Sequence, residues 1–215
     1  MKDEIHRYIE SLLPARVKLF AEMEQYALKH RVPIMEPVGM ETLIAMLKLQ
    51  KPERMLEIGT AIGYSALRMA DAVPSLHITT MERDSERHEQ ALQNIGRSND
   101  EERIHVLFGD ALELAEEAEK YGPFDAIFID AAKGQYRRFF DLYAPMLAPN
   151  GVIYSDNVLF KGYAAGIETP SKRIEKMVQK IMDYNEWLMT HPDFQTMILP
   201  SGDGIAVSIK RSEEK

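Results

Sequence analysis

Between residues 54 and 155 the chain alternates short apolar segments with amphipathic segments of helical period. The expected strands are 54–58, 77–81, 104–108, 124–129 and 151–155. The helices expected after the first four strands are 63–72, 85–97, 111–120 and 135–144. Segment 124–129 (FDAIFI) is apolar almost throughout, as a strand covered on both faces should be. Because βα repeats join parallel strands through crossovers, this alternation predicts a doubly wound, mostly parallel sheet.

The chain on either side of this alternation adds helices and a hairpin. Helices are expected at 3–13, 15–30 and 38–49 before it, and at 170–190 after it. Two late strands, 194–199 and 205–209, flank Pro200-Ser201-Gly202-Asp203-Gly204, which is a hairpin signal. We therefore predict an α/β fold in a single domain, 1–215, with seven strands, an antiparallel C-terminal hairpin at the sheet edge and an N-terminal helical extension over 1–50. The tail, 212–215, is expected to fray.

Composition removes several classes of protein. The 215 residues include no cysteine, which excludes a disulfide framework, a thiolate zinc site and a cysteine nucleophile. Lys and Arg total 26 against 34 Asp and Glu, so a net charge of −8 excludes a uniformly basic nucleic-acid binder but allows a local basic patch. No apolar run approaches the roughly 18 residues of a membrane span, and the polar start MKDEIH does not read as a signal peptide. We expect a cytoplasmic protein that binds neither DNA nor a membrane.

Acidic residues recur where the expected strands end. These strand ends carry Glu57, Glu82, Asp110, Asp130 and Asp156. In doubly wound sheets, ligands bind outside the carboxyl ends of the strands. Carboxylates have no structural need to gather at one sheet edge, so this pattern predicts a binding site there.

The first strand runs into a glycine-rich turn, LEIGTAIGYS, over residues 56–65. Gly59 and Gly63 allow a tight turn and a close approach of the backbone to a ligand. The turn is neither a G-x-G-x-x-G fingerprint nor a P-loop. Glu82 is placed to accept from the two hydroxyls of a ribose, and Asp110 from an adenine amino group. Together they indicate an adenosine ligand without a pyrophosphate, such as S-adenosylmethionine; a turn without ligand, or a nicotinamide cofactor, is the alternative.

Asp130, Asp156 and Asn157 form a second candidate group, with Lys133 close by in the sequence. All three offer hard oxygen donors, which suit Mg²⁺, with Mn²⁺ or Ca²⁺ also possible. Zinc is less expected, because it prefers nitrogen and sulfur ligands and the six histidines show no metal-binding spacing. The alternative is that these residues form no metal site: 156–157 is then a turn, Asp130 an ordinary acid at a strand end and Lys133 a solvated lysine.

Five motifs, LEIGTAIGYSA, the strand end at Glu82, GDA, IDAAKGQY and DNVLFKG, occur in an order and spacing that resemble the cation-dependent class I O-methyltransferases, which include the catechol and caffeoyl-CoA enzymes. The resemblance covers about residues 35–210 and implies metal ligands at Asp130, Asp156 and Asn157 and a catalytic lysine at Lys133. It implies a homodimer as well. The implied S-adenosylmethionine contacts are Val38, Glu57, Gly59, Ser65, Glu82, Asp110, Ala111 and Asp130.

The runs PIMEPVGME, AAKGQY, DNVLFKG and NEWLMTHPDFQT, with the ending GDGIAVS, resemble the bacterial tRNA 5-hydroxyuridine methyltransferases. This resemblance implies tRNA as partner and methylation of wobble 5-hydroxyuridine in the anticodon loop to 5-methoxyuridine. The chain has Ala131-Ala132 where catechol-type enzymes carry bulky residues. The alternatives are a small catechol or caffeoyl-CoA-like phenol as acceptor, or a non-catalytic S-adenosylmethionine-binding protein.

Charge favours an RNA acceptor weakly. Residues 131–180 hold eight basic and four acidic residues, a local balance of +4 in a chain of −8. Arg137, Arg138 and Lys161 are candidates for phosphate contacts, and Tyr136 and Phe160 for stacking on a splayed base. The alternative is that the charged residues form a solvated helix face and that Tyr136 and Phe160 are ordinary packing residues.

Overall fold

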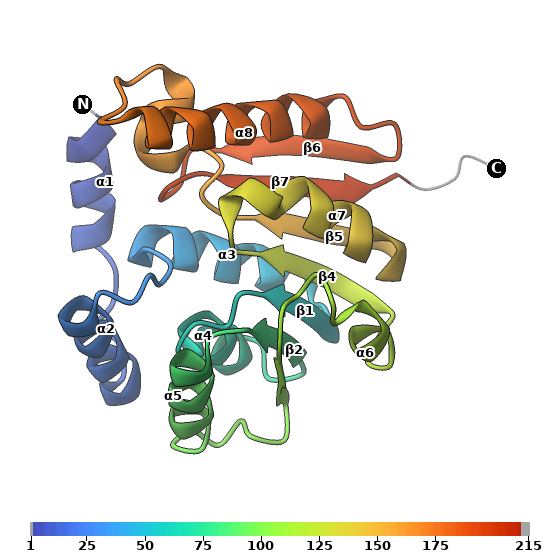
Figure 1. Ribbon diagram of the computed structural model, residues 1–215. Coiled ribbons are helices and arrows are strands. Elements are labelled where there is room, and N and C mark those ends of the chain that lie inside the picture. The colour runs from blue at the N-terminus through green and yellow to red at the C-terminus, as the bar shows by residue number, and fades with distance from the viewer. Residues whose placement is uncertain (1, 212–215) are drawn as a thin grey trace.

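The structure is a computed structural model that describes residues 2–211 (Figure 1), so the tail expected to fray lies outside the described residues. Its strands form one seven-stranded sheet in the order β3-β2-β1-β4-β5-β7-β6. The strands are β1 (Arg54–Ile58), β2 (His77–Glu82), β3 (Ile104–Phe108), β4 (Phe124–Ile129), β5 (Leu147–Ser155), β6 (Phe194–Leu199) and β7 (Ile205–Lys210). Strands β1 to β5 are parallel, and β7 runs antiparallel to both β5 and β6. The predicted fold is confirmed, with the second strand of the hairpin on the inside.

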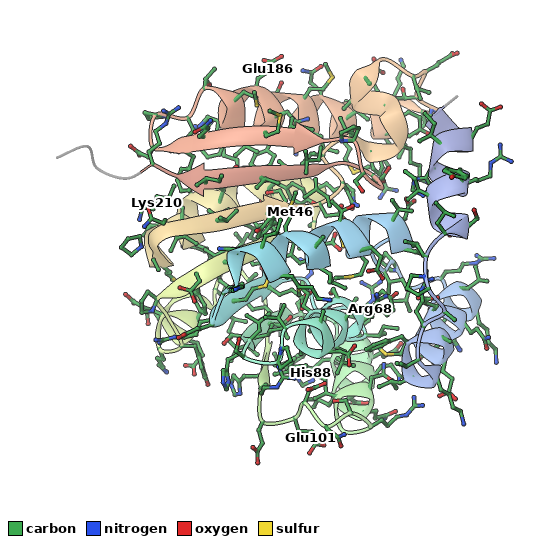
Figure 2. The ribbon with its side chains drawn as sticks, turned by 180° about the vertical axis from the view of Figure 1, so that it is seen from behind. Met46, Arg68, His88, Glu101, Glu186 and Lys210 are labelled. Carbon is green, nitrogen blue, oxygen red and sulfur yellow. The ribbon has the colours of Figure 1, made fainter. Side chains whose placement is uncertain are left out.

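Helices cover both faces of the sheet. They are α1 (Lys2–Ser11), α2 (Lys18–His30), α3 (Pro37–Gln50), α4 (Tyr64–Ala72), α5 (Ser85–Ile95), α6 (Ala115–Glu119), α7 (Tyr136–Tyr143) and α8 (Lys172–Met189). Short 3₁₀ turns are η1 (Lys133–Gln135), η2 (Ala144–Met146) and η3 (Phe160–Ala165). Figure 2, seen from behind, shows α3 and α4 in front of the sheet, while Figure 1 shows α7 and α8 on the opposite face. No helix within residues 2–211 combines the length and the apolarity that crossing a bilayer requires.

The alternation of side chains along the central strand β4 divides the core in two. Ala126 and Phe128 pack in the cluster beneath α3 and α4, whereas Ile127 and Ile129 pack in the cluster beneath α7 and α8. All four side chains are fully buried. A strand buried on both faces needs apolar residues at every position, which is why its sequence shows no polar alternation.

The helix expected over 111–120 is the clearest difference from the predicted elements. Only α6, 115–119, forms there. The Asp110 carboxylate accepts a hydrogen bond from the Leu112 N–H at 3.0 Å, and the Asp110 carbonyl accepts one from Glu113 N–H at 2.8 Å. An aspartate that bonds its own downstream backbone favours a turn over a helix. This turn keeps Asp110 at the sheet edge.

Candidate active site

A cavity of about 360 Å³ lies along the carboxyl ends of the five parallel strands. Each of the five strand ends contributes to its wall. Its strand-end residues include Ile58, Gly59, Met81, Glu82, Gly109, Asp110, Asp130 and Asp156. The segment Pro33–Met35, between α2 and α3, lines it from the N-terminal extension. The predicted location of the site at this edge is therefore matched by a cavity.

The glycine-rich turn after β1 follows a path that requires glycine at position 59. Gly59 has φ of 113°, and a Cβ there would lie 2.0 Å from the Asp130 carbonyl oxygen. Gly63, with φ of 82°, is the N-cap of α4. The end of the neighbouring strand β2 also holds the turn, because the Ala61 N–H donates to Glu82 Oε2 at 2.8 Å. The N–H groups of Gly59 and Thr60 both donate to the Met81 carbonyl, so these hydrogen bonds fix the backbone of the turn along the cavity wall.

Glu82 is positioned by the backbone around it. Its Oε1 accepts from the N–H groups of Arg83 and Asp84, both at 2.9 Å. Its Oε2 accepts only from Ala61 among the described groups, so it keeps acceptor capacity toward the cavity. This is the oxygen that could accept from a ribose hydroxyl.

Asp110 lines the cavity next to Arg83, whose Nη1 lies 3.2 Å from Asp110 Oδ2. The Leu112 N–H and the Arg83 guanidinium lower the pKa of Asp110, because both stabilise its charged form. Ala111 also lines the cavity, and its carbonyl accepts from the Tyr143 hydroxyl. Arg83 and Arg87 belong to the cavity wall as well, and no motif in the sequence marked either residue.

Glu57 lies beneath the turn and not on the cavity wall. It is completely buried and accepts hydrogen bonds from Ser65 Oγ and from Thr80 Oγ1. Ser65, at the start of α4, does line the cavity. Val38 is buried on α3 outside the cavity wall, and its carbonyl accepts from Thr42 Oγ1 at 2.9 Å. Glu57 thus ties β1, β2 and α4 together below the turn.

Burial raises the pKa of Glu57 to about 7, because the charged carboxylate loses its hydration. A folded-state pKa above the unfolded value means that the folded state holds its proton to higher pH. Stability from this group is therefore complete below about pH 4 and falls as pH rises toward 7, by about 3 kcal/mol in total. We expect Glu57→Gln to flatten this part of the pH profile. Urea unfolding at pH 5, 6, 7 and 8 measures it, and an unchanged slope in the variant would contradict the assignment.

Asp130, Asp156, Asn157 and Lys133 meet on one side of the same cavity. Lys133 Nζ donates to Asn157 Oδ1, and Asn157 Nδ2 donates to Asp156 Oδ2 at 2.8 Å. Asn157 has a φ of 57°, in the left-handed region that side chains seldom adopt. The three predicted oxygen donors and the lysine are therefore brought together at one side of the cavity.

The two aspartates are costly to keep charged. Burial raises the pKa of Asp130 and raises that of Asp156 well above its usual range, and the charge of Asp130 adds to the effect at Asp156. Among the side chains that the structure describes, those of residues 4–211, no three Asp, Glu or His side chains gather closely enough to hold a metal ion. The donor set is instead two carboxylates and one amide oxygen. Such a set fits a hard divalent cation, whose charge offsets the repulsion and whose other positions take water or acceptor oxygens.

Asp203 lies next to the site, outside the residues that line the cavity, and the sequence indicated it only as part of a hairpin turn. Its carbonyl accepts from Leu159 N–H at 2.9 Å and Phe160 N–H at 3.1 Å, and its carboxylate accepts from Lys161 N–H. Its negative charge also contributes to the raised pKa of Asp130 and Asp156. The run Gly202-Asp203-Gly204 is an ordinary turn sequence, so the sequence carried no signal for these contacts.

The residues considered for base stacking lie in different environments. Tyr136 is 1% exposed, and its ring packs edge-on against Tyr184 at 5.6 Å, so it presents no free face. Phe160 is half-buried, and Lys133 Nζ lies 5.4 Å from its ring centroid. Of the two rings, Phe160 is the one beside the catalytic candidate Lys133.

The three cations considered for phosphate contacts are exposed. Arg138 Nη1 donates to Gln135, which lines the cavity. Lys161 follows Phe160 and is held through its backbone by Asp203. Arg137 lies over the Trp187 ring at 4.8 Å. Two of the three are therefore attached to residues at or next to the cavity wall.

Comparisons with known proteins agree with this geometry. The sequence profile of a family described as O-methyltransferase matches residues 13–211. Caffeoyl-CoA O-methyltransferases are 30% identical in Eucalyptus gunnii (95% of this chain, 86% of the relative) and 29% identical in Medicago sativa (95% and 87%).

Among solved structures, a putative caffeoyl-CoA O-methyltransferase from Staphylococcus aureus matches with a TM-score of 0.87 and 33% identity, over 98% of this chain and 99% of that one. An O-methyltransferase from Bacillus cereus in complex with SAH matches with a TM-score of 0.83 and 25% identity, over 98% and 100%. The family profile, the relatives and the solved structures all indicate the same family, and the five strand ends of this chain line one cavity. The chain belongs to the O-methyltransferase family and is an S-adenosylmethionine-dependent O-methyltransferase.

Proposed function

We propose that this O-methyltransferase depends on a divalent cation, Mg²⁺ in the first place. Its proposed acceptor is the 5-hydroxyl of wobble 5-hydroxyuridine in the anticodon loop of tRNA, which becomes 5-methoxyuridine. One observation carries the proposal. Lys133, Asn157 and Asp156 are joined by hydrogen bonds, and together with Asp130 they line the same cavity as Glu82 and Asp110.

The chemistry requires a deprotonated oxygen in line with an electrophilic methyl group. Asp130, Asp156 and Asn157 would hold the cation, and Lys133 is placed beside them to take or steer the acceptor proton. A bound divalent cation lowers the pKa of an acceptor hydroxyl and orients it. In 5-hydroxyuridine the hydroxyl has a carbonyl oxygen next to it, so the base offers a chelating pair of oxygens that resembles the two adjacent hydroxyls of a catechol.

Charge and space around the cavity support an RNA acceptor. Arg138 and Lys161 are exposed and contact Gln135 and Asp203, Arg137 is exposed on the same helix as Arg138, and Lys180 Nζ lies 3.6 Å from the position of a Cβ on Gly134. Lys172 and Lys176 continue this cationic side along α8 at intervals of four residues. Phosphate groups bind such clusters, and a half-exposed ring such as Phe160 suits a splayed base.

A second candidate acceptor is a small phenol. The names of the relatives in Medicago sativa and Eucalyptus gunnii favour it, since both are caffeoyl-CoA O-methyltransferases. Against it stand the small side chains Ala131 and Ala132 on the cavity wall, which leave a phenol ring without an aromatic neighbour at that point.

A labelling experiment separates the two acceptors. Purified protein and Mg²⁺ are incubated with methyl-labelled S-adenosylmethionine and either tRNA carrying wobble 5-hydroxyuridine, free catechol or caffeoyl-CoA. We expect label in tRNA, lost when EDTA is added and restored by excess Mg²⁺. Label only in the phenols would overturn the tRNA assignment, and transfer that resists EDTA would overturn the cation.

Reversing single charges tests the RNA surface. We expect Arg137→Glu, Arg138→Glu and Lys161→Glu each to weaken tRNA binding roughly tenfold at low salt and to reduce the salt dependence of binding, because a phosphate contact is lost. Fluorescence anisotropy with labelled tRNA measures it. Lys48→Glu, an exposed position on α3 across the sheet, is the matched control. Unchanged affinity in all three variants would remove this surface from the proposal.

We propose in addition that the chain acts as a homodimer. The apolar side chains of α1 support this, because Ile5, Tyr8 and Ile9 are 55%, 65% and 40% exposed and Leu12, just beyond the helix, is 65% exposed. Exposed apolar side chains that gather in one patch typically contact another protein surface. Light scattering at several concentrations, on the wild type and on Ile5→Lys, tests it; a monomer at all concentrations would contradict it.

A further inference from the structure

The segment that carries Asp156 and Asn157 has an unfavourable backbone. Asn157, Phe160 and Lys161 have φ values of 57°, 38° and 55°, in the left-handed region. Non-glycine residues there cost free energy and persist only where surrounding contacts hold them. The contacts that hold this segment therefore decide where the Asp156 carboxylate and the Asn157 amide lie.

Helix α8 forms hydrogen bonds with this segment on both sides of Asp156 and Asn157. The Tyr184 hydroxyl shares a hydrogen bond with Ser155 Oγ at 2.8 Å. Asn185 Nδ2 donates to the Val158 carbonyl at 2.8 Å. Ser155 directly precedes Asp156 and Val158 directly follows Asn157, so two successive residues of one helix bracket the pair.

The β6–β7 hairpin holds the following residues but not the bracketed pair. Val158 N–H donates to the Gly204 carbonyl at 3.1 Å, and the next two N–H groups donate to Asp203. Asp156 itself is held by its N–H, which donates to the Ile129 carbonyl at 3.0 Å. Side-chain support for Ser155 and for the Val158 carbonyl thus comes from α8.

The same turn of α8 also supports the Lys133 side of the site. Tyr136 directly follows η1, and its buried ring packs edge-on against Tyr184, which is 3% exposed. Lys180, one turn earlier on α8, lies beside Gly134. The Lys133 segment and the Asn157 segment, which contact each other through these two side chains, therefore both pack against α8.

The buried polar atoms of this assembly are not all paired. Within residues 4–211, whose side chains are described, the buried side-chain atoms without a hydrogen-bond partner are Tyr136 Oη and Asn185 Oδ1. Both belong to the group of residues that joins α8 to the Lys133 and Asp156 segments. Proteins leave few buried polar atoms unpaired, and those that remain concentrate where function, and not stability, selects the side chain.

We propose that Tyr184 and Asn185 are positioning residues, which set the Asp156 carboxylate and the Asn157 amide for the divalent cation. This inference rests on the proposed cation dependence. Partners that orient the ligands of a metal typically change its affinity by about 10-fold to 100-fold when they are removed. Neither residue lines the cavity, so neither is expected to contact cofactor or acceptor.

The test measures the cation directly and not turnover. Wild type, Tyr184→Phe and Asn185→Leu are saturated with S-adenosylhomocysteine and titrated with MgCl₂ or MnCl₂ by calorimetry. We expect each variant to bind the cation about 10-fold more weakly or worse, with unchanged S-adenosylhomocysteine affinity. Tyr154→Phe is the matched control, because Tyr154 is also a buried tyrosine next to Ser155 in sequence, but its hydroxyl donates to Gln50 on α3, across the sheet. It should lose similar stability and keep the cation affinity.

The outcomes distinguish a failure of the positioning role from a failure of the proposed cation dependence. If the wild type binds the cation and both variants bind it equally well, with only their melting temperatures lowered, the α8 contacts are structural and the proposal is wrong. If the wild type binds neither Mg²⁺ nor Mn²⁺, the cation dependence and the positioning role fall together. Should Asn185→Leu fail to fold, Tyr184→Phe alone decides, since it keeps the ring that packs on Tyr136.

Discussion

Replacing Gly59 by alanine is expected to abolish cofactor binding and to destabilise the fold by roughly 3 kcal/mol or more. The added Cβ would lie 2.0 Å from the Asp130 carbonyl oxygen and 2.8 Å from its carbonyl carbon. Both atoms belong to the backbone at the end of β4, so no side chain can move aside to relieve the clash. Either the turn or the end of β4 must shift, and both carry the cavity wall.

The matched control for Gly59→Ala is Gly166→Ala. Gly166 also has a positive φ, 95°, but no atom lies within 4 Å of its added Cβ. It should show only the backbone strain of about 1–2 kcal/mol and keep its affinity for S-adenosylhomocysteine. Calorimetric titration and urea unfolding measure both variants. Near-normal cofactor affinity in Gly59→Ala would mean that the turn is not part of the cofactor site.

The variant Asp156→Asn is expected to lower methyl transfer roughly a thousandfold, equivalent to about 4 kcal/mol of transition-state stabilisation. Asp156 is 2% exposed, and its carboxylate is one of two in the proposed cation site. An amide keeps the size of the side chain and an oxygen donor but removes the negative charge, so the cation loses one of its two anionic ligands while packing is preserved. Cofactor affinity should change little, because the adenosine-side acids Glu82 and Asp110 are untouched.

Steady-state turnover with tRNA and titration of S-adenosylhomocysteine together check the Asp156→Asn result. Asp125→Asn is its control, since the Asp125 carboxylate accepts from the N–H groups of Glu53 and Arg54 at the opposite end of the sheet. This variant should lose some stability and keep its turnover. Full activity in Asp156→Asn would exclude a cation held by this carboxylate.

Elements with a strong local pattern were predictable from the sequence. The strands 54–58, 104–108, 124–129 and 194–199 form as expected, because each is a short apolar run bounded by turns. The helix over 111–120 was wrong in its first turn, since a local hydrogen bond from Leu112 to the Asp110 carboxylate competes with the helix. Periodicity does not report such side-chain to backbone bonds.

The site was predictable where it followed from topology alone. Parallel strands end at one edge, so acids at five strand ends had to approach each other, and the cavity contains Glu82, Asp110, Asp130 and Asp156. The fifth acid, Glu57, faces inward under the turn. Which face of its strand end a side chain takes depends on the neighbouring strand, here on the hydroxyl of Thr80.

The sequence by itself determined the fold class, the edge of the sheet that carries the site, and the residue types that meet there, because alternation and strand order depend on local pattern. Only the tertiary structure decided that Tyr136 is buried, that Asp203 reaches the Phe160 segment, and that Tyr184 and Asn185 bracket Asp156 and Asn157. The hydrogen bonds among these contacts join residues 27 to 44 positions apart in the chain, through a helix and a hairpin that fold back over the strand ends. Their geometry depends on how those elements pack, and packing between distant elements leaves no periodic trace in the sequence.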